Sequence, residues 1–146
     1  MKYIVYTDGA YDQNKKLAGL AYLIITDSEY INSASITLTG INGSTYVECI
    51  SIGLALAYLH DNIKLTKDDV VEIHTDSKSA ITFYEEHITH NSYIPSKYKQ
   101  VVNSVHIARK IKSICSLTFD KVAAHKATLS PNVVVDRLSK LAVRRG

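Results

Sequence analysis

The sequence predicts an α/β fold in which a mixed five-stranded sheet is flanked by helices. The N-terminal part of the chain contains three consecutive strand-like segments joined by short polar turns, which is the pattern of an antiparallel meander. A strongly periodic helix and a further β-branched strand follow, so the first and fourth strands should be parallel neighbours connected by a helical crossover. The 146 residues are 46% hydrophobic and include no linker rich in Gly, Pro or Ser, which predicts a single domain over residues 1–146.

The three N-terminal strands are predicted from side-chain type and alternation. The first is the β-branched and aromatic run Tyr3–Thr7, which should end at the turn signal Asp8-Gly9-Ala10. A polar loop over residues 11–16 then leads to an apolar strand at Ala18–Thr26. The third strand, Tyr30–Thr39, alternates apolar and polar residues, as expected when one face is buried.

The crossover helix is the best-defined helix of the sequence. Thr45 and Glu48 have the spacing of a capping box, and apolar residues then recur at helical spacing to about His60. The remaining predicted elements are a strand at Val70–Thr75, a helix at Ser77–Glu86, an irregular stretch at His87–Pro95, a helix at Ser96–Ser113, a strand at Ser116–Ala124 and a closing helix at Pro131–Val143.

Charge is distributed unevenly along the chain. The net charge is +3, but residues 1–86 carry −6 and residues 87–146 carry +9. The stretch from His87 to Phe119 contains no acid and five basic residues, Lys97, Lys99, Arg109, Lys110 and Lys112. This bias is typical of a surface that faces a polyanion, although a solvated basic face without a partner would produce it too.

Four acids come from four separate predicted elements. Asp8 and Asp76 each close a strand, and because the carboxyl ends of parallel strands meet at one edge of a sheet, their side chains should lie close together. Glu48 lies in the first turn of the crossover helix and Asp136 in the closing helix. Taken singly, each acid has a structural explanation as a turn, cap or ion-pair residue. Packed together they would repel unless bound to cations, and Mg²⁺ is the natural candidate.

Four ordered motifs surround these acids. They are Tyr6-Thr7-Asp8-Gly9-Ala10, the helix-opening Glu48, His74-Thr75-Asp76-Ser77, and Asn132 followed by Asp136-Arg137-Leu138-Ser139. In this order the motifs resemble those of ribonuclease H type 1, and they span almost the whole chain. The resemblance implies a ribonuclease H-like fold, with a mixed five-stranded sheet in β-β-β-α-β-α-β-α-type order. It also implies an endoribonuclease that hydrolyses the RNA strand of RNA–DNA hybrids.

The resemblance further implies a role for each acid. Asp8, Glu48, Asp76 and Asp136 would hold two Mg²⁺ ions, for which Mn²⁺ can substitute. In the family, the residue matching Asp8 bridges both metals, the one matching Asp136 lies on the nucleophile side, and the other two lie on the leaving-group side. Two such metals would activate a water and stabilise the leaving 3′ oxygen, giving 5′-phosphate products. His125 matches a loop histidine that moves a proton or assists product release.

The candidate substrate-binding residues are Asn14, Thr45, Lys78, Lys97, Lys99 and Asn132. Several of them depart from the family pattern: the loop after Asp8 lacks a Gly- and Pro-rich run, Ser44-Thr45 replaces a common Asn pair, and Lys78 replaces a common Gln. The chain contains no Trp, and residues 87–99 are too few for the basic protrusion of bacterial members. Substrate is therefore expected to be held by the basic helix over residues 97–112.

Two other functions remain open at this stage. A catalytically inactive hybrid-binding module would keep the fold without the reaction, and a DNA nuclease of the same superfamily would use a similar acidic cluster. The longest apolar runs fall short of the roughly 18 to 20 residues of a membrane helix, and we expect no cleavable signal before the first strand. We therefore expect a cytoplasmic monomer with an RNA–DNA hybrid as partner. Its two cysteines, Cys49 and Cys115, should be buried and unpaired.

Overall fold

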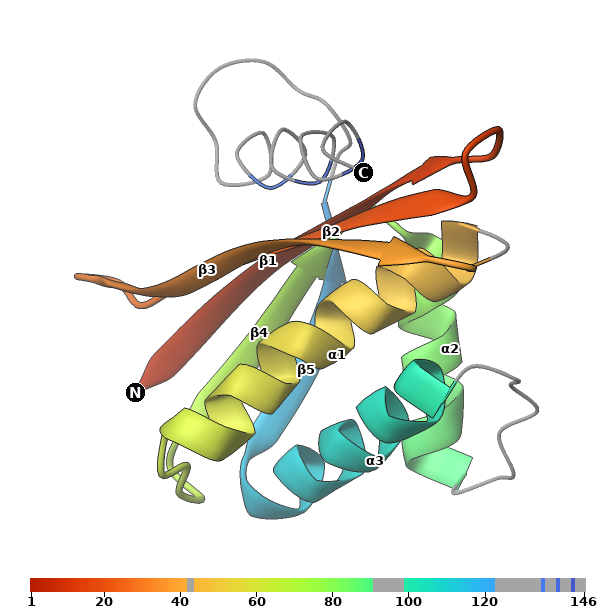
Figure 1. The fold of residues 1–146 in the computed structure, drawn as a ribbon. Coiled ribbons are helices and arrows are strands. Elements are labelled where there is room, and N and C mark those ends of the chain that lie inside the picture. The colour runs from red at the N-terminus through yellow and green to blue at the C-terminus, as the bar shows by residue number, and fades with distance from the viewer. Residues whose placement is uncertain (42–43, 91–98, 123–134, 136–138, 140–142, 144–146) are drawn as a thin grey trace.

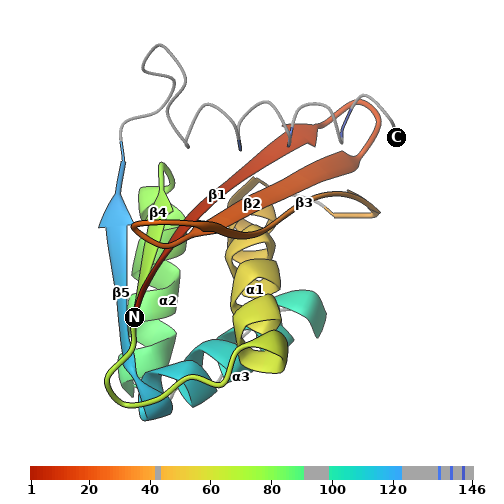
Figure 2. The same cartoon turned by 90° about the vertical axis from the view of Figure 1, so that its left-hand side faces the viewer.

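The computed structural model describes residues 1–41, 44–90 and 99–122 together with Val135, Ser139 and Val143, and only the backbone of residues 44 and 45. Within this part of the chain, five strands form one sheet and three helices cover one of its faces (Figures 1 and 2). The elements are β1 (Lys2–Asp12), β2 (Leu17–Ile25), β3 (Tyr30–Thr39), α1 (Ser44–Asn62), β4 (Val70–Thr75), α2 (Lys78–His90), α3 (Lys99–Ile114) and β5 (Ser116–Lys121). No helix in the described part is long and apolar enough to cross a membrane.

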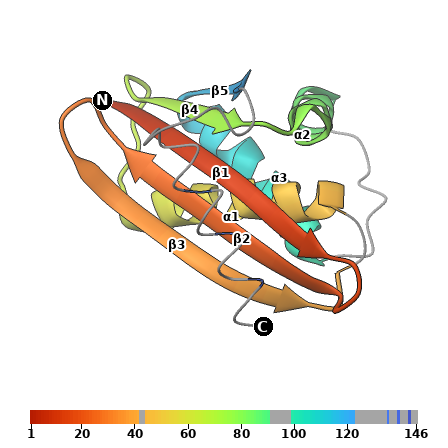
Figure 3. The ribbon, with the colours of Figure 1, turned by 90° about the horizontal axis from the view of Figure 1, so that it is seen from above.

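The sheet is mixed, with the strand order β3-β2-β1-β4-β5 (Figure 3). The first three strands pair antiparallel as a meander, while β4 lies parallel to β1 and β5 lies parallel to β4. The helix α1 provides the crossover between β3 and β4. This confirms the predicted α/β class, the mixed five-stranded sheet and the parallel pairing of the first and fourth strands.

The first strand is longer than predicted. We expected it to end at Thr7 and to be followed by a polar loop, but β1 continues to Asp12, which pairs with Leu17 of β2. The turn is correspondingly tight: the Asp12 carboxylate accepts hydrogen bonds from the backbone N–H groups of Asn14 and Lys15, and Lys16 adopts a positive φ of 53°. Cross-strand pairing with β2 therefore overrides the local turn signal at residues 8–10.

Helix boundaries also differ from the prediction. The helix α1 begins at Ser44, which places Thr45 inside the first turn and Glu48 beyond it, so Glu48 is not the capping partner of Thr45. The helix α2 continues past Glu86 to His90. The added turn is anchored because His87 is buried and its ring lies 4.5 Å from that of Phe83.

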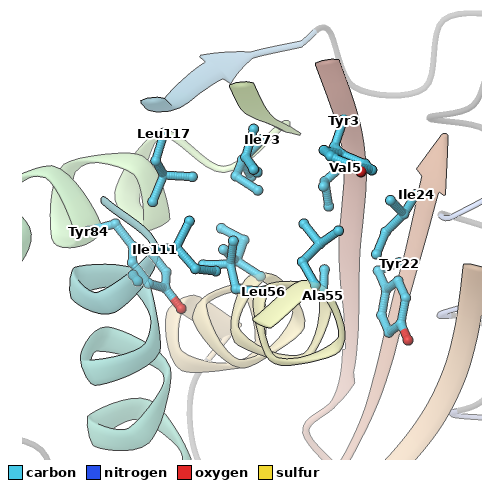
Figure 4. Packing of buried hydrophobic residues seen from close by; sticks show 14 of the residues in the cluster. Tyr3, Val5, Tyr22, Ile24, Ala55, Leu56, Ile73, Tyr84, Ile111 and Leu117 are labelled. Atoms are coloured by element: carbon cyan, nitrogen blue, oxygen red, sulfur yellow. The ribbon is translucent and has the colours of Figure 1, made fainter. Parts of the chain in front are cut away.

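The main hydrophobic core lies between the sheet and the three helices (Figure 4). It is formed by inward-facing strand residues such as Val5 and Ile73, by Leu56 of α1 and by Ile111 of α3. The fully buried Tyr84 of α2 extends into this core, and its hydroxyl donates a 2.6 Å hydrogen bond to the backbone carbonyl of Cys49. The core thus holds α1 against β1 and β4, the two strands that bear the predicted acids.

Candidate active site

The sheet places Asp8 and Asp76 at the point where β1 and β4 separate. The parallel pairing of these strands ends at Tyr6 and His74. Asp76 directly follows the end of β4, and Asp8 lies two residues beyond the last paired position of β1. Asp8 is thus within a strand, contrary to the prediction of a strand end, but it still lies past the end of its parallel neighbour.

Glu48 reaches these aspartates because α1 packs closely on β1. The contact depends on Gly9, since a Cβ atom there would lie 2.6 Å from Cγ1 of Val47 and 3.5 Å from the carboxyl carbon of Glu48. The backbone N–H of Gly9 donates a hydrogen bond to the Glu48 carboxylate. A glycine after Asp8 therefore permits the close approach of α1 and also provides a hydrogen-bond donor to the Glu48 carboxylate.

The three carboxylates converge. One oxygen from each of Asp8, Glu48 and Asp76 lies within 4.8 Å of the other two. Asp8 is buried, and the Oε2 atom of Glu48 is buried without a hydrogen-bond partner among the described residues. A buried, unpartnered carboxylate oxygen is costly, and a cation bound between the three acids would satisfy it.

The electrostatics of the cluster also favour a bound cation. Burial, followed by the charges of Asp8 and Asp76, raises the pKa of Glu48 to about 9. The hydrogen bond from Gly9 opposes this shift without cancelling it. In the absence of a cation, Glu48 is therefore protonated at neutral pH, whereas a divalent ion would favour its charged form.

Two serines support Asp8. The buried Ser51 of α1 donates its hydroxyl to the backbone carbonyl of Asp8 at 2.9 Å and to that of Val47 at 3.0 Å. The buried Ser139 donates to Oδ2 of Asp8 at 3.3 Å. Neither serine was among the predicted site residues, and Ser139 appeared only as the last residue of the motif Asp136-Arg137-Leu138-Ser139. For Ser51 the available signal was a polar residue on the apolar face of the crossover helix, and for Ser139 it was helical spacing of three residues from Asp136.

Some predicted site residues lie outside the described part of the chain. These are Lys97, His125, Asn132 and Asp136, and for Thr45 only the backbone is described. Of the others, Asn14 is exposed in the turn between β1 and β2. Lys78 and Lys99 are exposed at the first residues of α2 and α3.

Two residues of the predicted basic helix contact backbone carbonyls of the protein. The Arg109 guanidinium donates to the carbonyl of His87 at the end of α2, at 2.9 and 3.1 Å. The Lys112 ammonium donates to the carbonyl of Leu117 at 3.3 Å. Leu117 lies near the start of β5, at the end of the sheet opposite to Asp76, because β4 and β5 run parallel.

Comparison with known proteins identifies the family. The RNase H family model matches residues 1–144. No curated protein matches the chain. Solved structures with the same fold include RNase H1 of the halophilic archaeon Halobacterium salinarum, with 18% identity over 100% of both chains and a TM-score of 0.67.

Two further structures agree along nearly their whole length. LC11-RNase H1, solved in complex with an RNA/DNA hybrid and isolated from compost by a metagenomic approach, is 20% identical over 98% of this chain and 97% of its own, with a TM-score of 0.71. The N-terminal RNase H domain of a Mycobacterium tuberculosis protein is 17% identical over 98% and 99% of the two chains, with a TM-score of 0.69. With its mixed sheet, its converging acids and the match over residues 1–144, this chain belongs to the RNase H family of enzymes.

Proposed function

We propose that this protein is a divalent-metal-dependent endoribonuclease that hydrolyses the RNA strand of RNA–DNA hybrids and leaves 5′-phosphate ends. The observation that carries the proposal is the convergence of Asp8, Glu48 and Asp76, with donor oxygens within 4.8 Å of one another. Membership of the RNase H family supports the reaction class. The hybrid bound to LC11-RNase H1 supports the substrate class.

The donor set fits a hard divalent cation. All three described ligands are carboxylates, which Mg²⁺ prefers, and the unpartnered Oε2 of Glu48 is available for coordination. Asp8, Glu48 and Asp76, with Asp136, would hold two Mg²⁺ ions. When bound, such ions activate a water for attack on phosphorus and stabilise the departing 3′ oxygen.

The chain's own residues would position these ligands and the substrate. The Gly9 N–H and Ser139 hydroxyl hold the Glu48 and Asp8 carboxylates in place. We assign His125 the transfer of a proton or the assistance of product release. Lys78 follows Asp76 closely at the start of α2, where its ammonium suits a phosphate of the hybrid.

The decisive assay uses three labelled substrates: an RNA–DNA hybrid, duplex DNA and a four-way DNA junction. With Mg²⁺ present, we expect cleavage of the RNA strand of the hybrid alone, and none after addition of EDTA. Degradation of the downstream product by a 5′-phosphate-dependent exonuclease would show the 5′ phosphate. Cleavage of duplex or junction DNA would instead favour the DNA nuclease, and hybrid binding without cleavage would favour the inactive module.

A matched pair of substitutions assigns the activity to the cluster. Asp76→Asn should abolish cleavage while the protein stays folded, because Asp76 is proposed to hold metal and its side chain is only partly buried. The control is Asp68→Asn, which changes an exposed acid before β4. Equal activity of the two variants would contradict the proposal.

A further inference from the structure

A second group of metal-binding side chains lies on the face of the sheet opposite the helices. On β4 the core-facing residues Val71 and Ile73 alternate with Glu72 and His74, which face the other way. The edge strand β5 lies beside β4 (Figure 3). Its residue Asp120 pairs directly with His74. Donor atoms of Glu72, His74 and Asp120 all lie within 4.8 Å of one another. None of the three belongs to the cluster of Asp8, Glu48 and Asp76.

The distances within this second group suit one small cation. His74 Nε2 lies 3.2 Å from Glu72 Oε1 and 3.9 Å from Asp120 Oδ2. In a tetrahedral zinc site with bonds of about 2.0 to 2.1 Å, neighbouring donor atoms are about 3.3 to 3.5 Å apart. The three atoms would therefore need only small rotamer adjustments to bind a common ion.

The positions on the strands make this arrangement rigid. Glu72 and His74 are two residues apart on one strand, so their side chains share a face, and Asp120 lies beside His74 on the next strand. The Lys2 ammonium of β1 holds Glu72 Oε2 at 2.9 Å, which leaves Oε1 directed at His74. Ligating carboxylates in metal sites are commonly oriented by such a second hydrogen bond.

The chemistry of the donors discriminates between metals. An imidazole nitrogen with two carboxylates suits Zn²⁺, whereas Mg²⁺ favours oxygen ligands alone. With a neutral imidazole, the one ammonium and two carboxylates leave a net charge of −1, which attracts a dication. Asp120 is 58% exposed, so an ion reaches the group from solvent and keeps a position for water.

We propose that Glu72, His74 and Asp120 form a Zn²⁺ site that clamps the edge strand β5 to β4. The site is independent of the proposed hydrolysis and does not rest on it. Its structural effect follows from topology, since β5 is short and, within the described residues, lies at the sheet edge and pairs with β4 alone. Beyond β5, the chain is tied to β4 by the hydrogen bond from the Val122 N–H to the Thr75 carbonyl at 2.9 Å. A metal at this site would therefore stabilise the end of β4 that precedes Asp76.

Calorimetric titration of Zn²⁺ in a large excess of Mg²⁺ tests the site, because Mg²⁺ then occupies the carboxylate cluster. We expect the wild-type protein to bind one Zn²⁺. The Zn²⁺ affinity of His74→Gln and of Asp120→Asn should be lower by at least about 10-fold. The matched control is His60→Gln, because His60 Nδ1 also lies 3.2 Å from a carboxylate oxygen, that of Asp61, but forms no group of three among the described residues. It should bind Zn²⁺ like the wild type.

Amide hydrogen exchange supplies a second readout. Zn²⁺ should slow exchange in β5 of the wild type and of His60→Gln but not of Asp120→Asn. Because the Asp120 side chain is exposed, its substitution should not unfold the protein, so unfolding would not explain the missing effect. Equal Zn²⁺ affinity in wild type, His74→Gln and Asp120→Asn would overturn the proposal. Cleavage of hybrid with Mg²⁺ alone, measured on the same preparations, is expected to be unchanged in all three variants. Absence of that cleavage even in the wild type would count against the proposed function and not against the zinc site.

Discussion

At the scale of single residues, Asp8 combines burial with a negative charge. It is 5% exposed and shares its surroundings with the carboxylates of Glu48 and Asp76. Its backbone carbonyl and its side chain each accept a hydrogen bond from a serine. Such an arrangement favours binding of a cation over stability of the metal-free protein.

Asp8→Asn should therefore stabilise the metal-free protein. Removing the buried charge of Asp8 ends its repulsion with the Asp76 carboxylate, and a gain of about 1 kcal/mol corresponds to a melting temperature roughly 2 to 4 °C higher for a chain of this size. Added Mg²⁺ should then raise the melting temperature of the variant less than that of the wild type, since it binds the variant more weakly. Thermal melts with EDTA and with Mg²⁺ check both expectations. A variant destabilised in EDTA and fully responsive to Mg²⁺ would contradict them.

Glu48 predicts a pH dependence of stability. Its pKa is raised in the folded protein to about 9 from an ordinary value of 4.5, so the unfolded chain loses this proton at lower pH than the folded protein does. The stabilising contribution is complete below the unfolded pKa and is lost as pH rises towards the folded pKa. In EDTA, the free energy of unfolding of the wild type should thus decrease between about pH 5 and pH 9 relative to Glu48→Gln. Urea unfolding at several pH values measures the difference, and parallel pH profiles would refute it.

Ser139→Ala should weaken metal binding. The substitution removes the hydroxyl that donates to Asp8 Oδ2 at 3.3 Å, and a hydrogen bond worth about 1 kcal/mol corresponds to roughly a 5-fold change in affinity. The Mg²⁺ concentration for half-maximal cleavage should rise accordingly, while kcat at saturating Mg²⁺ changes little. Ser104→Ala is a matched control, because that hydroxyl donates to the Gln100 carbonyl within α3. An unchanged Mg²⁺ requirement in Ser139→Ala would remove Ser139 from the site.

At the scale of elements, two glycines permit close packing at different places. A Cβ atom at Gly19 of β2 would lie 1.8 Å from the Ser139 carbonyl oxygen and 2.9 Å from Cγ2 of Val143. A Cβ atom at Gly53 of α1 would lie 1.8 Å from the Ser104 hydroxyl oxygen of α3. The first contact places Ser139 beside Asp8, whereas the second joins two helices within the core.

Gly19→Ala should therefore lower both the stability of the protein and its affinity for Mg²⁺. Gly53→Ala should lower the stability alone. Each substitution forces an overpacked contact, which typically costs about 1 to 3 kcal/mol. Only Gly19→Ala should raise the Mg²⁺ concentration needed for cleavage, because only it displaces Ser139 from Asp8. Melting temperatures and Mg²⁺ titrations of the two variants test the separation. An identical Mg²⁺ requirement in both would show that the Gly19 contact does not position the site.

At the scale of the whole molecule, the basic residues lie at different distances from the acidic cluster. Lys78 begins α2 just after Asp76, while Lys112 contacts the backbone of Leu117 near the start of β5, at the opposite end of the sheet. A phosphate backbone that crosses the acids would thus meet Lys78 and not Lys112. The sequence analysis had predicted that the basic helix over residues 97–112 holds the substrate.

Lys78→Ala and Lys112→Ala should consequently differ in their effect on hybrid binding. Loss of one phosphate contact makes the slope of log affinity against log salt less negative by roughly one unit, and we expect this for Lys78→Ala only. KM at physiological salt should rise while kcat stays within about 2- to 3-fold, because the contact is made equally in ground and transition states. Binding measured across a salt series provides the test. A slope change in Lys112→Ala alone would show that the hybrid contacts Lys112 and not Lys78.

The type and order of the elements, and the family, were predictable from side-chain patterns and motifs alone. Periodicity and turn signals reflect neighbours in the chain, so the three-strand meander, the crossover helix and the parallel fourth strand were all predictable. The acids at residues 8, 48 and 76 were predictable candidates as well, because each occurs in a motif and at or near the end of an element.

The lengths of the elements and the contacts of their side chains depend instead on how distant segments pack together. The first strand continues past Asp8 because β2 pairs with it, and Glu48 contacts Gly9 and Asp8 instead of capping its own helix. Ser139 reaches Asp8 across 131 residues of sequence, and Arg109 binds the end of another helix. Strand ends, burial and hydrogen-bond partners depend on segments that are distant in the chain, and local sequence patterns do not specify these contacts residue by residue.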